Sequence, residues 1–385
     1  NNHLRKKLIT WLYDVGTYLK MQFESIHWGI YLLDIYLDLT IDIKKDDLQC
    51  VGATCLYIGS KLNDVDPITA DEIIYLSNSG SDGKIFYSRE QHILETFKYK
   101  LIVPIPYLIV HSYKKNNCDI TPEMYHVIKY ILSCETYCID TKLYKPTLLA
   151  ISAIYIAIVI IDKYLWDHTY IDFSTYTEEE IISCAHHMIT SIQNLLKTTD
   201  ISVTIQSDLI NDITDINCLT DTLSRSHHSK HISNIEYVTS LSHSHSHFHQ
   251  TTPPVHKDFN NLIDLYDYAN KTILGTGQYG TVYKIKNKFT GTVVALKHQK
   301  FNQSFLREIA ILTILDHPNI VKACDVFWGT ATDVFFSMEI METNLKSYLK
   351  PFKKLSIMSQ FDFSPVCDNQ DNPGLDIQTY RAISY

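Results

Sequence analysis

Three glycines and two charged residues in the second half of the sequence have the types and spacing needed to hold a phosphate group. Gly275, Gly277 and Gly280 form a G-x-G-x-x-G pattern, and glycine lets the backbone approach phosphate oxygens where a Cβ atom would clash. Lys297 can place a positive charge on those oxygens, and Glu308 can hold the lysine in position. The pattern therefore predicts a site for a triphosphate group.

The residues around these glycines favour a series of β-strands. Ile273-Leu274 precedes the pattern, Val282–Ile285 reads as a return strand, and Val293–Lys297 reads as a third strand. In a dinucleotide-binding fold a helix would follow the glycines directly. The alternative is an ordinary β-hairpin with a surface lysine, which the specificity of the combined motif disfavours.

The order of these motifs resembles the small lobe of a protein kinase, and their residues resemble the cyclin-dependent kinases. The matching stretches are Tyr283–Lys284, Asn287–Gly291, Val293–Lys297, Asp316–Lys322 and Asp325–Val326, and Ser304–Glu308 stands where that family carries its cyclin-binding PSTAIRE helix. The resemblance implies an α+β lobe over residues 261–350, built from a five-stranded antiparallel sheet and one helix.

The resemblance also assigns roles at the nucleotide site. Lys297 and Glu308 correspond to the catalytic ion pair, and the implied cofactor is ATP with Mg²⁺. The residues expected to contact ATP are Gly275, Gly277, Gly280, Val282, Ala295, Lys297, Glu339 and Met341.

One part of a kinase has no counterpart in the sequence. A kinase uses an H-R-D-x-x-x-x-N loop, whose Asp accepts the substrate proton and whose Asn holds magnesium, and no such stretch follows Lys350. Asp362-Phe363-Ser364 resembles a variant of the magnesium-binding DFG motif, so Asp362 is a candidate magnesium contact. The alternative is that residues 351–385, rich in Asp, Asn, Pro and Gly, form a disordered tail. We expect no autonomous kinase activity, and whether the chain is an enzyme stays open.

The first half of the sequence has helical periodicity throughout. Leu4, Leu8, Trp11 and Val15 fall at helical spacing, as do apolar residues over 48–62. Gly52 and Gly59 in that second helix would permit close approach of another helix. The apolar run 148–161 is too short to span a bilayer and is typical of a buried core helix. The pattern predicts an all-α bundle followed by a second, similar bundle after about residue 106.

The residues of both bundles resemble a cyclin of the mitotic type. The matching stretches are Leu4–Leu12, Tyr31–Asp34, Leu48–Thr54, Ile58–Asp64, Tyr144–Ala150 and Tyr176–Ile181. The resemblance implies a first cyclin box over residues 1–105, whose first helix is shortened, and a second over residues 106–197.

Several charged and apolar positions correspond to partner-binding residues of cyclins. Arg5 and Asp34 match a pair that locks the first two helices together, and Lys61 and Glu90 match a pair that grips the kinase near its PSTAIRE helix. The alternative for Lys61 and Glu90 is a solvated surface ion pair, which contributes little. A groove that captures substrates with an R-x-L motif is implied at Leu4, Leu8, Trp11, Asp14 and Gln49, although Lys7 replaces an apolar groove residue.

Residues 198–260 have the composition of a linker. They are rich in Ser and His and include alternating histidines over 243–249, so they are expected to be disordered and to chelate metal only adventitiously. Among the nine cysteines, Cys134 and Cys138 lie four apart on a predicted helix, where two buried thiols are favoured over a metal site. The net charge of −9 argues against nucleic-acid binding, and no signal peptide or membrane span is evident, so we expect a cytoplasmic or nuclear protein.

Together these features predict a multidomain chain in which an all-α cyclin double box is joined by a linker to a kinase small lobe. The leading hypothesis is a cyclin–kinase fusion, of viral origin in view of its fused and shortened parts, whose cyclin half binds a cyclin-dependent kinase in cis or in trans. The alternatives are a trans-acting cyclin with a vestigial kinase lobe, and a fragment of an active fusion enzyme.

Overall fold

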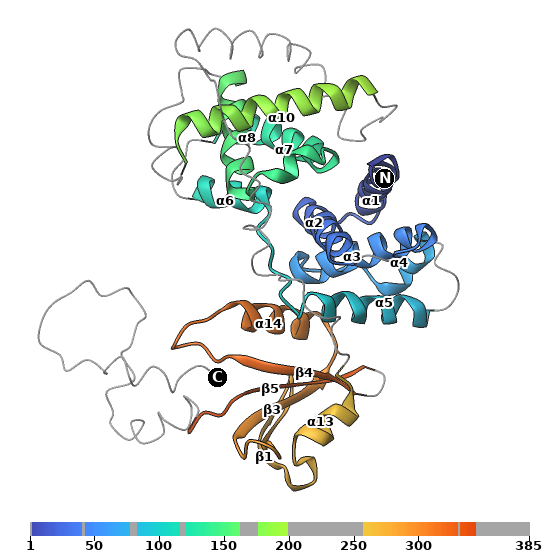
Figure 1. The fold of residues 1–385 in the computed structure, drawn as a ribbon, viewed down its shortest axis with the longest axis vertical. Helices are drawn as coiled ribbons and strands as arrows, with labels where there is room; N and C mark the ends of the chain where they lie inside the picture. Colours follow the sequence, from blue (N-terminus) through green and yellow to red (C-terminus); the bar gives the residue numbers. More distant parts are fainter. Residues whose placement is uncertain are drawn as a thin grey trace, which may run out of the picture. The chain divides into compact units, whose positions relative to one another are not determined.

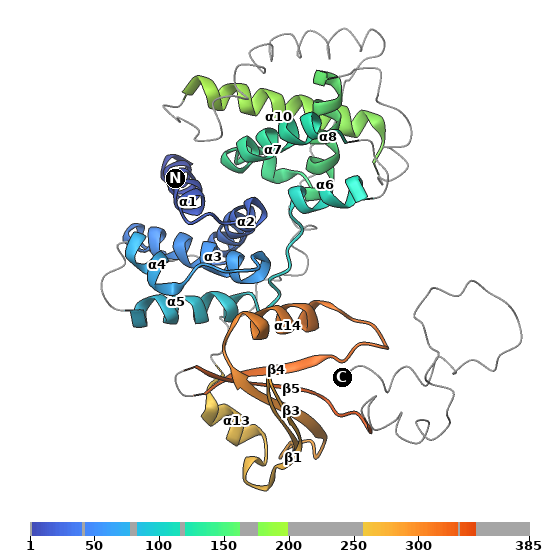
Figure 2. The same cartoon turned by 180° about the vertical axis from the view of Figure 1, so that it is seen from behind.

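The computed structural model describes residues 2–40, 43–77, 83–115, 120–161, 176–198, 257–329 and 332–343. The chain divides into two compact units (Figures 1 and 2). Unit 1 comprises Asn1–Phe97 and Val103–Pro254, and unit 2 comprises Lys98–Ile102 and Val255–Tyr385. The predicted tail residues, including Asp362, and the histidines of the linker lie outside the described residues.

The first bundle of unit 1 contains helices α1 to α5. Their bounds are α1 Asn2–Tyr18, α2 Phe23–Leu39, α3 Leu48–Asn63, α4 Ala70–Leu76 and α5 Gly83–Thr96. Helix α3 packs against the other four. A Cβ atom at Gly59 would lie 2.5 Å from the carbonyl oxygen of Ser25, and one at Gly52 would lie 3.1 Å from Leu8. The glycines of α3 therefore do permit the close helix approach predicted from the sequence.

The second bundle surrounds one apolar helix. Its helices are α6 Pro106–Lys115, α7 Pro122–Tyr137, α8 Pro146–Ile161 and α10 Glu178–Thr198. Every residue of α8 from Leu148 to Ile158 is buried, and α6, α7 and α10 all pack against this helix. The run is thus a buried core helix, and no described helix is long and apolar enough to cross a membrane.

Unit 2 contains a five-stranded antiparallel sheet with a helix on each face (Figures 1 and 2). The strands are β1 Thr272–Gly277, β2 Gly280–Lys286, β3 Val293–Lys300, β4 Ala323–Trp328 and β5 Asp333–Glu339, in the order β1-β2-β3-β5-β4. Helix α14, Gln303–Ile314, buries Phe305, Leu306, Ile309 and Ala310 against one face. The fold class predicted from the sequence is confirmed.

The helix on the opposite face was not predicted. Helix α13, Phe259–Leu265, begins inside the range expected to be linker. Asp258 caps it, because the Asp258 carboxylate accepts from the Asn261 backbone N–H at 3.0 Å. Leu262 and Tyr266 are buried with a group of sheet residues, namely Ile285, Leu296, Phe327 and Phe335. The sheet face opposite α14 is therefore apolar, and it is covered by α13 and Tyr266, which precede β1 in the sequence.

Candidate functional site

The three glycines of the predicted phosphate loop have different structural reasons to be glycine. Gly280 has a φ of +131°, and a Cβ atom there would lie 2.2 Å from the carbonyl oxygen of His298. A side chain is excluded because β2 lies too close to β3. A Cβ atom at Gly275 or Gly277 would meet no other atom within 4 Å. These two glycines leave open space beside β1, as a backbone that approaches phosphate oxygens requires.

Lys297 and Glu308 form an ion pair. The Lys297 Nζ atom lies 2.7 and 2.8 Å from the two carboxylate oxygens of Glu308. Lys297 lies on β3 and Glu308 on α14, and Gln299 also donates to the Glu308 carboxylate at 3.4 Å. The Lys297 and Glu308 side chains are 16% and 34% exposed. A pair that solvent still reaches can be approached by a charged ligand.

The sheet register brings the other predicted nucleotide contacts to the same face as Lys297. Val282 pairs with Lys297 across β2 and β3, and Gly275 pairs with Val282 across β1 and β2. Residues opposite each other on neighbouring strands share a face, and so do alternate residues of one strand, which adds buried Ala295. This is the face that α14 covers in part.

The last two residues expected to contact ATP, Glu339 and Met341, lie at and just after the end of β5. Glu339 is the last residue of this strand, and its carboxylate accepts from the Lys322 backbone N–H at 3.3 Å. Met341 follows the strand and is half-buried. The glycine loop, the Lys297–Glu308 pair and these residues suit a nucleotide with its phosphates toward Lys297. The predicted magnesium contact, Asp362, lies outside the described residues, and the described part of the chain contains no cluster of metal-ligating side chains.

In unit 1, the predicted kinase-gripping residues are a buried pair. Lys61 on α3 donates to the carboxylate of Glu90 on α5, and the residues are only 5% and 2% exposed. The Lys61 Nζ atom also lies 4.1 Å from the centre of the Tyr57 ring. Burial lowers the pKa of Lys61, and the Glu90 carboxylate opposes this shift. The geometry differs from a solvated surface ion pair.

The predicted Arg5–Asp34 pair is part of a larger network. Both hydrogen bonds from Arg5 to the Asp34 carboxylate measure 2.7 Å, and Arg5 also donates to the Thr136 carbonyl oxygen at 2.7 Å. The Lys142 Nζ atom lies 3.5 Å from Asp34 and 3.4 Å from the carboxylate of Glu135. The network thus joins α1 and α2 of the first bundle to α7 and the short 3-10 helix Asp140–Leu143 of the second.

The residues of the predicted R-x-L groove lie on two packed helices. Leu4, Leu8, Trp11 and Asp14 belong to α1, and Gln49 is at the start of α3. Leu8 is buried, Leu4 and Trp11 are half-buried, and Asp14 and Gln49 are exposed. Lys7 is exposed as well. The residues provide apolar surface with one acidic side chain, and peptide docking there stays a prediction.

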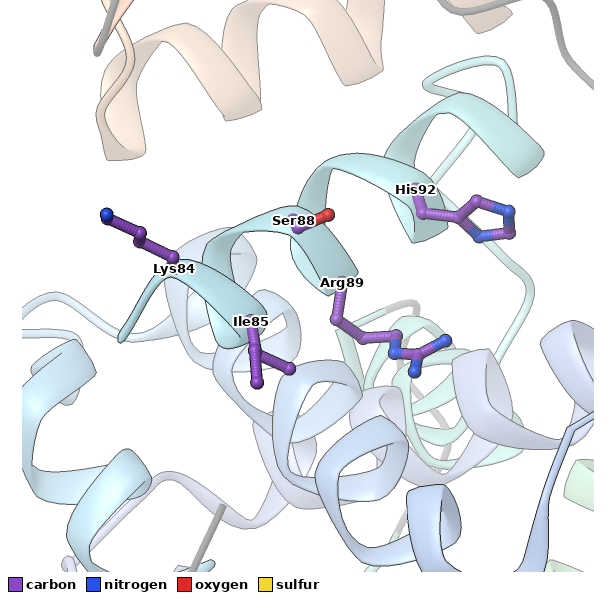
Figure 3. A pocket seen from close by; sticks show the side chains of 5 residues that line it. All are labelled: Lys84, Ile85, Ser88, Arg89 and His92. Atoms are coloured by element: carbon purple, nitrogen blue, oxygen red, sulfur yellow. The ribbon is translucent and has the colours of Figure 1, made fainter. Parts of the chain in front are cut away.

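Unit 1 also contains the two cysteines that were predicted to be buried and one pocket that was not predicted. Cys134 and Cys138 are both buried, and burial raises the pKa of each thiol to about 12. Lys84, Ile85, Ser88, Arg89 and His92 line a pocket along α5 that the sequence did not indicate (Figure 3).

Two polar groups of this pocket, those of Arg89 and His92, have partners in the protein. The Arg89 guanidinium lies 3.4 Å from the Asp47 carboxylate, and the Tyr36 hydroxyl is hydrogen-bonded to His92 at 2.8 Å. Burial and the nearby Arg89 charge lower the pKa of His92. His92 therefore adds little positive charge at neutral pH.

Comparisons with known families identify the parts of the chain. Residues 1–102 match the family described as cyclin, N-terminal domain, and residues 102–212 match cyclin, C-terminal domain. Residues 268–365 match the protein kinase domain. The chain therefore consists of two cyclin boxes followed by a fragment of a protein kinase domain.

Similar curated proteins match the cyclin half. Cyclin-B1-2 of Arabidopsis thaliana is 27% identical over 186 residues, which cover 48% of this chain and 41% of that protein. G2/mitotic-specific cyclin-B of Hydra vulgaris is 28% identical, covering 48% and 50%. Cyclin-A1 of Homo sapiens is 26% identical, covering 47% and 39%. The matched region spans half or less of these relatives.

Among solved structures, a chain in the crystal structure of the yeast RNA Pol II CTD kinase CTDK-1 complex is similar, with a TM-score of 0.45 and 18% identity. That likeness covers 57% of this chain and 76% of the other.

Proposed function

We propose that the cyclin half is a regulatory module of the mitotic type that binds and activates a cyclin-dependent-type serine/threonine kinase lobe, and that the lobe of the same chain is one such partner. The cyclin boxes would contact the kinase through the Lys61–Glu90 region. The lobe would bind ATP with Mg²⁺ on the sheet face that carries Lys297. This role would place the protein in the cell cycle, and the fusion of cyclin and kinase parts favours a viral origin.

The observation that carries the proposal is the Lys297–Glu308 ion pair, with hydrogen bonds of 2.7 and 2.8 Å. In protein kinases this pair must be in place for phosphoryl transfer, and positioning of its helix controls it. The chain combines cyclin domains with part of a kinase domain, so it would contain both a regulator and an element that the regulator acts on.

Nucleotide binding by the full chain tests the lobe. We expect Mg²⁺-ATP to raise the melting temperature of the parent protein but not of Lys297→Met. Lys300→Met is the matched control, because Lys300 lies on the same strand, is 66% exposed and pairs with Asp333 at 2.9 Å. Equal ATP stabilisation of parent and Lys297→Met would refute the nucleotide site.

Capture of a separate kinase tests the alternative of a cyclin that acts in trans. In this role the cyclin boxes would act on a complete kinase from outside the chain. If a purified cyclin-dependent kinase gains activity on addition of the full chain, the trans role holds. If the full chain neither binds nor activates such a kinase, only the cis role is left.

A further inference from the structure

Gln299 is a buried polar residue on the sheet face of the proposed nucleotide site. It lies on β3 two residues after Lys297 and is 8% exposed. Alternate residues of a strand lie on the same face of the sheet, so Gln299 shares the face that carries Lys297. A buried amide without a hydrogen-bond partner costs free energy. The partners of this amide therefore indicate what the residue does.

The amide of Gln299 binds the carboxylate of Glu308. Its Nε2 atom donates to the Glu308 Oε2 atom at 3.4 Å, and the same oxygen accepts from Lys297 at 2.8 Å. A carboxylate can only accept, so the nitrogen of the amide is the end that must face it. Glu308 is the more exposed member of the ion pair, at 34% against 16% for Lys297. Gln299 thus gives this carboxylate a second attachment to β3.

Gln299 also lies close to the glycine loop. Thr281 pairs with His298 across β2 and β3, so Gly280, which precedes Thr281, comes opposite Gln299. A Cβ atom at Gly280 would lie 2.9 Å from the Cβ atom of Gln299. One residue of β3 is therefore near both the third glycine of the loop and the Glu308 carboxylate.

The start of α14 is fixed close to the end of β3. Two residues, Phe301 and Asn302, join the strand to the helix. The Phe301 backbone N–H donates to the Thr332 carbonyl oxygen at 2.7 Å. The Asn302 side chain accepts from the Phe305 backbone N–H at 2.9 Å and so caps the helix. Contacts within the lobe therefore keep the Glu308 carboxylate within reach of β3.

We infer that Gln299 is a positioning residue of the nucleotide site, which holds the Glu308 carboxylate in place when Lys297 binds the phosphates of ATP. The inference rests on the proposed function, which it deepens by naming a residue that sets the affinity for the nucleotide. Gln299 acts through Glu308 and needs no contact with ATP itself.

The physical reason is the number of donors that Lys297 can offer. An ammonium group has three N–H donors, and in this structure Lys297 bonds to both oxygens of Glu308. A phosphate that takes one of these donors weakens the ion pair. The amide of Gln299 keeps a donor on the carboxylate at that moment. Because the amide is neutral, it does not compete with Lys297 for the phosphate, as a cation at position 299 would.

Calorimetric titration of the full chain with Mg²⁺-ATP tests the inference. Gln299→Met keeps the length of the side chain and removes its donor. We expect the dissociation constant for Mg²⁺-ATP to rise about three- to tenfold, the effect of losing one hydrogen bond. In a Glu308→Ala background, Gln299→Met should cause no further loss, because Gln299 acts through that carboxylate. Lys300→Met, at the next and more exposed position of β3, is the matched control and should keep the parental affinity.

Gln299→Glu is a second variant of the same size. Its carboxylate repels that of Glu308, so the loss of affinity should exceed that of Gln299→Met. Equal losses from Gln299→Met in the parent and in the Glu308→Ala background would overturn the inference, because Gln299 would then act without Glu308. If Lys297→Met loses Mg²⁺-ATP binding while Gln299→Met keeps the parental affinity, the nucleotide site stands and only the role of Gln299 fails. If the parent does not bind Mg²⁺-ATP, both fail.

A measurement without nucleotide tests the contact itself. In the full chain labelled with ¹⁵N-glutamine, the side-chain N–H signals of Gln299 are identified by their loss in Gln299→Glu. We expect these signals to move in Glu308→Ala and to stay in place in Lys300→Met. Signals that do not respond to the loss of the Glu308 carboxylate would overturn the inference. Helical content and melting of each variant show whether it folds.

Discussion

The cyclin boxes and the kinase lobe use charged pairs in opposite ways. In the cyclin boxes, Lys61–Glu90 is buried and Arg5–Asp34 is nearly so, and in each pair the cation donates hydrogen bonds to the carboxylate. In the lobe, the Lys297–Glu308 pair keeps one-third of the glutamate side chain exposed beside open space at the glycine loop. A buried pair fixes the geometry of its helices, whereas an exposed pair beside a loop is available to a ligand.

Breaking the buried network should give the largest effect. Asp34→Ala would leave Arg5 and Lys142 without a carboxylate that lies 2.7 and 3.5 Å away. Removing one partner of a buried pair typically costs about 3–5 kcal/mol. We expect the free energy of unfolding of the cyclin boxes to fall by this amount in urea denaturation followed by circular dichroism. The matched control is Asp38→Ala on the same helix, and an equal loss in both variants would contradict a special role for the network.

The stability of the kinase lobe should depend on apolar packing, whereas that of the cyclin boxes should depend on the network of charged residues. Leu262→Ala on α13 removes a fully buried side chain from the sheet face opposite α14. Such truncations lower the free energy of unfolding by about 2–5 kcal/mol. We expect the transition of unit 2 to shift to lower urea concentration, measured by fluorescence in a background where Trp328 is the one tryptophan left and Trp11, Trp28 and Trp166 are replaced by Phe. Asp264→Ala, at an exposed position of the same helix, should leave it in place. An unchanged transition in Leu262→Ala would mean that α13 does not stabilise the lobe.

The sequence predicted each unit's fold because local patterns carry it. Helical spacing over 48–62, the all-apolar run of α8 and the glycine loop between strands are each readable within a few residues. Contacts between distant residues are not readable in this way. Arg5 reaches Thr136 and Lys142 reaches Asp34 through tertiary structure alone, so the network's second half was missed.

Helix α13 was missed because its surroundings have the composition of a linker. Two signals were nevertheless present. Asp258 and Asn261 have capping-box spacing, and Val334-Phe335-Phe336 is an unbroken apolar run in β5, typical of a strand buried on both faces. The sequence also could not show why position 280 must be glycine, because this requirement depends on how closely β2 approaches β3.

The proposed binding role of the buried Lys61–Glu90 pair predicts an effect on affinity between two molecules. Lys61→Ala removes the charge that the proposed contact requires and leaves Glu90 buried without its partner, which disturbs the surface that α3 and α5 would present to a kinase. Lys61→Ala should therefore weaken association with a separate cyclin-dependent kinase at least tenfold, at about 1.4 kcal/mol per decade. Calorimetric titration measures this, with Lys45→Ala in the exposed turn before α3 as the control. Unchanged affinity would reduce the pair to a structural element of the boxes.

The smallest expected effect is a pH dependence confined to the cyclin boxes. His27 is buried, and burial together with the charges of Lys142 and Lys129 lowers its pKa to about 3. The Tyr13 hydroxyl is hydrogen-bonded to its Nε2 atom at 2.9 Å. Between pH 6.5 and 3 the unfolded chain therefore binds a proton that the folded protein does not, and stability falls as the pH falls.

The expected contribution of His27 by pH 5 is a loss of about 2 kcal/mol, at about 1.4 kcal/mol per pH unit below 6.5. Urea denaturation at pH 7 and pH 5 measures it, and His27→Gln should lose less stability over that interval than the parent. The His298 ring in the lobe, which lies 3.1 Å from the Asp333 carboxylate and is partly exposed, is the comparison. His298→Gln, a change outside the cyclin boxes, should not flatten the pH dependence. If His27→Gln and the parent lose equal stability between pH 7 and pH 5, burial of His27 does not oppose its protonation in the folded protein. The contrast between the buried polar groups of the cyclin boxes and the exposed ones of the lobe would then not hold for His27.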